Sequence, residues 1–110
     1  MKHIIYLNEA GSKVARRIAT ELNDYQLSLT GDFNEDLFRN SQALIFVGAL
    51  GVCVRMIAPF VRDKHTDPAV VCVDSIGRNA IAVLSGHVGG ANEICSEVAR
   101  VLGANPVITT

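Results

Sequence analysis

The residues best suited to chemistry lie in one short stretch, residues 85–93, with the sequence SGHVGGANE. Its three glycines let the chain turn sharply and bring main-chain N–H groups close to a ligand, and a histidine lies among them. A patterned helix is expected to follow, and its first turn offers unpaired N–H groups and the positive end of the helix dipole. We therefore predict an anion-binding loop. An ordinary glycine-rich turn with a solvated histidine is the alternative.

The spacing of these glycines, at positions 86, 89 and 90, is not that of a nucleotide-binding loop. It matches neither G-x-G-x-x-G nor G-x-x-x-x-G-K-[ST], and no Lys-Ser or Lys-Thr pair follows. The residues alone therefore favour an anion without indicating which one.

The composition indicates one domain with a well-covered core. The chain has 110 residues, of which 49% are apolar, yet no apolar run reaches the roughly 18 residues that a membrane-spanning helix needs. We therefore expect no membrane partner. The apolar excess is typical of a sheet that helices cover on both faces.

Charge and cysteine usage exclude further classes of function. The net charge is −1 and there is no Trp, so the chain has neither the basic field nor the stacking surface of a nucleic-acid binder. The three cysteines are odd in number and far apart, which favours small core residues in a reducing compartment. The N-terminal residues are not typical of a signal peptide. We expect a cytoplasmic protein.

Hydrophobic patterns predict the elements that position the loop. Strands are expected over residues 3–7, 25–29, 43–47, 69–73, 80–84 and 106–109. Helices are expected after a cap at Ser12 as far as residue 22, after a cap at Asn34, over residues 52–62 and over residues 91–102, the last ended by a glycine. Pro59 predicts a kink or two short helical pieces within residues 52–62.

The order of these elements predicts a three-layer α/β/α fold with a mixed, mostly parallel sheet. The connection over residues 74–79 is so short that the strands on either side of it must form an antiparallel hairpin. Ligands of such sheets gather at the carboxyl ends of the parallel strands, where residues 48–51 are expected. If residues 69–73 run parallel to residues 43–47, the loop of residues 85–90 opens at the opposite edge. The sequence leaves open whether the two loops share an edge.

Four segments in one order carry a family resemblance. They are GALGVCVRMIAP at residues 48–59, DK at residues 63–64 with TDPAVV at residues 66–71, SGHVGGANE at residues 85–93 and PVITT at residues 106–110. In these segments the chain resembles the N-terminal domain of the cobalt-precorrin-5A hydrolase family of anaerobic cobalamin (vitamin B12) biosynthesis. The resemblance is dense from residue 44 to residue 110 and slight before it.

The resemblance implies an enzyme that opens the lactone of cobalt-precorrin-5A with water, releases acetaldehyde and gives cobalt-precorrin-5B. Family members are longer, which implies a C-terminal domain or a homo-oligomer as partner. The alternatives are a non-catalytic corrinoid-binding domain and a generic anion-binding domain. No cofactor is expected, because the cobalt arrives within the corrinoid substrate. No metal site is expected, because the histidines and cysteines lack ligand spacing.

The same resemblance suggests which residues meet a flat corrinoid rimmed with carboxylates. Arg55 and Arg62 lie seven residues apart on one expected helical face, as carboxylate partners. The expected main-chain donors are Gly48, Gly51, Gly86, Gly89 and Gly90.

Hydrolysis of a lactone needs a base for water and donors for the developing oxyanion. The expected catalytic residues are His87 as the base, because an imidazole titrates near neutrality, and Ser85, which with Asn92 orients water or substrate. Asp67 and Asp74 are expected to shape turns, and His65 is expected to be a solvated loop residue.

Overall fold

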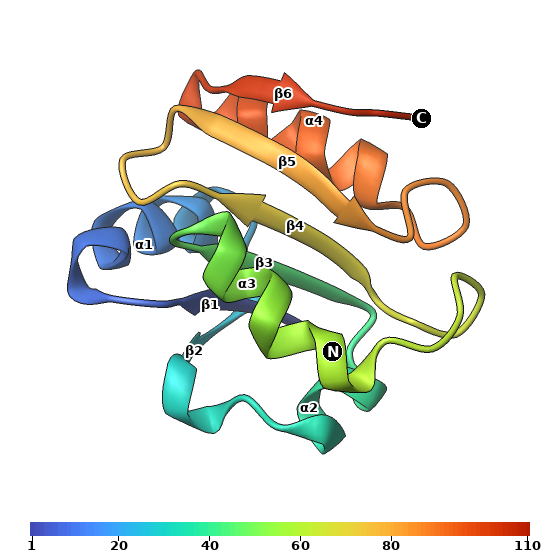
Figure 1. Cartoon of the computed structure of the whole chain (residues 1–110). Coiled ribbons are helices and arrows are strands. Elements are labelled where there is room, and N and C mark those ends of the chain that lie inside the picture. Colours follow the sequence, from blue (N-terminus) through green and yellow to red (C-terminus); the bar gives the residue numbers. More distant parts are fainter.

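A six-stranded sheet forms the middle of the molecule (Figure 1), and the computed structural model describes the whole chain, residues 1–110. The strands lie in the order β2-β1-β3-β4-β5-β6. Their bounds are β1 Lys2–Tyr6, β2 Gln26–Leu29, β3 Ala43–Val47, β4 Ala69–Val73, β5 Asn79–Leu84 and β6 Asn105–Val107. All six predicted strands are present.

The sheet is mixed, as predicted. β1 pairs in parallel with both β2 and β3, and β3 pairs in parallel with β4. β5 is antiparallel to β4, and β6 is parallel to β5. The carboxylate of Asp74 closes the β4–β5 hairpin, because its Oδ1 accepts hydrogen bonds from the amides of Arg78 at 3.0 Å and Asn79 at 2.6 Å. The prediction that Asp74 shapes a turn is confirmed.

Helices cover both faces of the sheet, which confirms the three-layer α/β/α fold. Helices α1 (Ser12–Glu21) and α4 (Ala91–Leu102) lie on one face, and α2 (Glu35–Asn40) and α3 (Leu50–Ile57) lie on the other (Figure 1). Alternate strand residues supply the two cores, because successive side chains of a strand point to opposite faces. β3 and β4 are buried along their whole length. No helix has the length and hydropathy needed to cross a bilayer.

Local capping explains the start of α2 and the end of α4. The side chain of Asn34 accepts a hydrogen bond from the Leu37 amide at 2.9 Å and caps α2, as predicted. Gly103, in the left-handed conformation, ends α4, also as predicted. Ser12 is the first residue of α1 and not its cap, because a 3₁₀ turn at Glu9–Gly11 precedes it.

Pro59 divides the predicted third helix. α3 ends at Ile57, a 3₁₀ turn follows at Ala58–Phe60, and Val61 is extended. The expected break is therefore confirmed. Arg62 lies beyond the helix, so the prediction that it shares a helical face with Arg55 is wrong.

Candidate functional site

The two glycine-containing loops lie at opposite edges of the sheet. Val47, the last residue of β3, pairs with Val73, which pairs with Ala80 near the start of β5. Leu84, the last residue of β5, pairs with Val70 near the start of β4. Residues 48–51 therefore follow the carboxyl ends of the parallel strands, and residues 85–90 lie at the amino ends (Figure 1). The sequence left open whether the two loops share an edge, and the strand pairing shows that they do not.

A pocket of about 300 Å³ opens at the amino edge. It is lined by residues from three separate parts of the chain: Lys64, Ser85, Gly86, His87, Val88 and Thr110. The His87 side chain is exposed on its wall. No acidic side chain lines this pocket, so the local charge suits an anion.

The loop of residues 85–90 presents main-chain donors to this edge. The amides of residues 86–90 donate to no protein acceptor. By contrast, the first two amides of α4 are already used, because Ala91 donates to the Ser85 carbonyl and Asn92 to the Gly86 carbonyl, both at 3.1 Å. Donors for an anion are thus the loop amides and not the first amides of the helix, which corrects the expectation drawn from the helix N-terminus.

Close packing at position 89 and backbone conformation at position 90 explain why these two loop residues are glycine. A Cβ on Gly89 would lie 2.5 Å from the Ser85 Cβ and 2.9 Å from the Ser85 carbonyl oxygen. Gly90 has a φ of 86°, in the left-handed region that favours glycine. These glycines let the loop fold tightly over Ser85.

Ser85 is buried beneath the loop and has a left-handed φ of 58°, which is uncommon for a residue with a side chain. Its hydroxyl donates to the carbonyl oxygen of Asp67 at 3.2 Å. The hydroxyl therefore joins the loop to the connection before β4. This geometry suits a positioning role better than the predicted role of orienting water.

Asp67 organises that connection. Its side chain is 1% exposed and forms an ion pair with Arg39 at 3.1 Å. The carboxylate also accepts from the amides of Arg62 at 2.8 Å and Asp63 at 3.0 Å. Arg39 donates in addition to the Phe60 carbonyl. The prediction that Asp67 shapes a turn is confirmed, and this turn carries Lys64.

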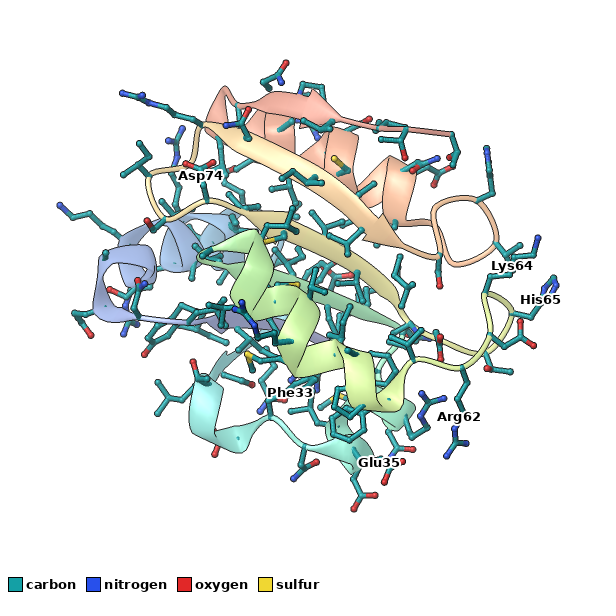
Figure 2. All side chains as sticks on the ribbon, viewed as in Figure 1. Phe33, Glu35, Arg62, Lys64, His65 and Asp74 are labelled. Carbon is teal, nitrogen blue, oxygen red and sulfur yellow. The ribbon has the colours of Figure 1, made fainter.

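Lys64 was absent from the predicted site although it lies in one of the recognised segments. Figure 2 shows its side chain rising from the connection before β4 towards the loop of residues 85–90, whereas His65 points outwards. Lys64 has no acidic partner within 4 Å, because the ion pairs are Lys2–Asp24, Arg39–Asp67 and Arg62–Glu35. The sequence contained the residue, but its position beside His87 depends on the antiparallel direction of β5.

Asn92 lies next to the loop but is engaged by the chain itself. Its side-chain nitrogen donates to the Thr110 hydroxyl at 2.9 Å. Its Oδ1 packs against Gly86, where a Cβ would lie only 2.8 Å from it. Asn92 therefore holds the C-terminal segment against the loop.

The predicted binding residues of the other loop have a structural explanation. The Gly48 amide donates to the Val73 carbonyl at 2.8 Å, and a Cβ on Gly48 would lie 2.7 Å from the Leu7 Cβ. Gly51 is the second residue of α3, and the guanidinium of the exposed Arg55 lies over it. Arg62 pairs with Glu35 at 3.5 Å. None of these residues reaches the pocket beside His87.

Potential metal ligands are dispersed. No three His, Cys, Asp or Glu side chains lie close enough together to hold a metal ion. The three cysteines are buried and unpaired, as predicted. Cys53 and Cys95 contribute to opposite cores.

One protein family and several known proteins are similar to this chain. The family "Cobalamin synthesis G N-terminal" matches residues 32–110. Two relatives named cobalt-precorrin-5A hydrolase are 60% identical over 67% of this chain (Priestia megaterium) and 55% identical over 66% of it (Salmonella typhimurium). The matches span about a fifth of each relative, 20% and 21% of their lengths.

A solved structure agrees with both the family and the fold. A cobalamin biosynthesis protein G homologue from Sulfolobus solfataricus superposes with a TM-score of 0.89 at 29% identity. The match covers 97% of this chain and 36% of that one. The chain therefore belongs to the cobalamin synthesis G N-terminal family.

Proposed function

We propose that this chain forms part of an enzyme of cobalamin biosynthesis that hydrolyses the lactone of cobalt-precorrin-5A, releases acetaldehyde and yields cobalt-precorrin-5B. The observation that carries the proposal is the 60% identity to a relative that bears this name. The family match over residues 32–110 includes every residue of the pocket beside His87. The unpaired cysteines support a cytoplasmic location.

The pocket supplies the groups that lactone hydrolysis needs. His87 is exposed on the pocket wall, where its imidazole accepts a proton from water as the water adds to the lactone carbonyl. The unused amides of residues 86–90 then donate to the oxygen that becomes negative. Water thereby supplies its hydroxyl to the carbonyl carbon and its proton to the imidazole. The lactone C–O bond then breaks, and the ring oxygen takes the proton back from the imidazolium and becomes an alcohol. Acetaldehyde leaves when the carbon that bears this alcohol separates from the macrocycle, which keeps the bonding electron pair while the hydroxyl proton is lost.

Ser85 and Asn92 act on this site through the loop. The Ser85 hydroxyl holds the loop to Asp67, and the Asn92 side chain holds it to Thr110. We assign both as positioning residues. Gly48, Gly51 and Arg55 remain outside the proposed site, since they lie at the other edge of the sheet.

The test is release of acetaldehyde from cobalt-precorrin-5A. We expect His87→Ala to lower the rate by about a hundredfold or more, the usual contribution of a general base, without a change in the circular-dichroism spectrum. His65→Ala is the matched control, because His65 is exposed and does not line the pocket. Equal rates for His87→Ala and the unmodified chain would remove His87 from the chemistry.

The alternative, a corrinoid-binding domain without catalysis of its own, has a distinct outcome in the same experiment. The chain would then change the absorption spectrum of the corrinoid on binding but release no acetaldehyde. The binding measurement is needed because the match spans only about a fifth of each relative.

A further inference from the structure

We propose that Lys64 and the loop amides of residues 86–90 form a subsite for one peripheral carboxylate of the corrinoid, and that Lys64 selects substrates whose carboxylate is free. This inference rests on the proposed function, because the corrinoid comes from it. It adds a residue and a ligand group to that function.

The first support is the lining of the pocket. Lys64 and His87 line it together with Gly86 and Val88, the amides of residues 86–88 have no protein acceptor, and no acidic side chain lines it. Lys64 is exposed and forms no ion pair, and it is the one Lys or Arg residue that lines this pocket. A free ammonium beside free amides is the arrangement that binds carboxylate oxygens through charge-assisted hydrogen bonds.

The second support is the rigidity of the connection that carries Lys64. Asp67 accepts from the amides of Arg62 and Asp63, and its own carbonyl accepts from the Ser85 hydroxyl. Lys64 also lies within a turn closed by Asp63, whose carbonyl accepts from the amides of Thr66 at 3.1 Å and Asp67 at 2.8 Å. These bonds hold the two sides of the pocket together, so the backbone that carries Lys64 and the loop amides keep their relative position, and the Lys64 side chain is free to reach the bound group.

The third support is size. A volume of about 300 Å³ is at the low end for pockets that enclose a whole small molecule. It suits one acidic arm of a much larger substrate, with the flat ring remaining outside.

The test compares two probes, a cobalt corrinoid with free peripheral carboxylates and the same corrinoid with those groups amidated. Their dissociation constants for this chain are measured by absorption titration at low and high salt. We expect the unmodified chain to bind the acid form more tightly at low salt, and Lys64→Met to weaken that binding about five- to tenfold while leaving the amidated form unchanged. Lys64→Arg should retain most of the preference, and Lys13→Met, exposed on α1 away from this pocket, should behave as the unmodified chain.

The outcomes separate this inference from the proposed function, because acetaldehyde release is measured in the same samples. Equal affinity of Lys64→Met and the unmodified chain for the acid form would overturn the subsite even if acetaldehyde is released. Binding of neither corrinoid, or binding of inorganic phosphate without any preference between the two corrinoids, would also overturn it. A Lys64-dependent preference without acetaldehyde release would support the subsite and count against catalysis by this chain.

Discussion

The hydroxyl of Ser85 donates to the carbonyl oxygen of Asp67 across 3.2 Å, and both residues are buried. Ser85 directly follows β5 and Asp67 precedes β4, so this bond joins the two loops at the amino edge of the parallel strands. The pocket that contains His87 and Lys64 lies over this junction. The site is therefore built between two antiparallel neighbours and not at the usual carboxyl edge.

Removal of the Asp67 carboxylate should destabilise the fold. Asp67→Ala leaves Arg39 without its ion pair and two amides without their acceptor, so we expect a loss of about 2–4 kcal/mol in the free energy of unfolding. Urea denaturation followed by circular dichroism measures it. Asp32→Ala, at an exposed position, is the control and should change the value by less than about 0.5 kcal/mol. A similar small change for Asp67→Ala would mean that the ion pair contributes little.

A methyl group at position 89 should disturb the loop over Ser85. Because its Cβ would lie 2.5 Å from the Ser85 Cβ, we expect Gly89→Ala to cost about 1–3 kcal/mol and to lower acetaldehyde release. Gly31→Ala is the matched control, since nothing lies within 4 Å of a Cβ there. The midpoint of thermal denaturation is measured for both variants and the unmodified chain. Equal midpoints for Gly89→Ala and the unmodified chain would show that the loop accommodates the methyl group.

His3 should make stability depend on pH. Burial, and secondarily the charge of the N-terminal amine, lower the pKa of His3 below its ordinary value of 6.5, and its Nδ1 lies 3.2 Å from the Ser28 hydroxyl. The unfolded chain therefore takes up the proton first as the pH falls. This contribution to the free energy of unfolding is complete above about pH 6.5 and is lost below it.

The measurement is urea denaturation at a series of pH values from 8 to 5. The slope of the free energy of unfolding against pH is compared below about pH 6.5. The free energy of unfolding of His3→Gln should decline less steeply there than that of the unmodified chain. The exposed His65→Gln should retain the original slope. Identical slopes for all three chains would exclude His3 as the titrating group.

The three thiols should be unreactive in the folded chain. The hydrogen bond with Cys72 and burial raise the pKa of the Cys53 thiol, and burial raises that of Cys95. The hydrogen bond with Cys53 lowers the pKa of Cys72, but Cys72 is buried and out of reach of a reagent. Because reaction needs an accessible thiolate, we expect negligible reaction with a chromogenic disulfide reagent in buffer and reaction of all three cysteines in denaturant. Rapid reaction of any one thiol in buffer would reveal local opening around it.

The sequence by itself determined the elements and the layers. Continuous apolar runs predicted β3 and β4, the three-and-four spacing predicted α4, and the short connection closed by Asp74 required an antiparallel hairpin. Pro59 predicted the end of α3 because its ring cannot continue a helix. These features depend on neighbours in the chain, which is why local patterns were sufficient.

Only the tertiary structure decided which loops meet. The pairing of β5 with β4 puts His87 beside Lys64 and separates both from Gly48 and Arg55, and this depends on strand order and direction. Such contacts join residues about twenty positions apart, and no local pattern specifies them.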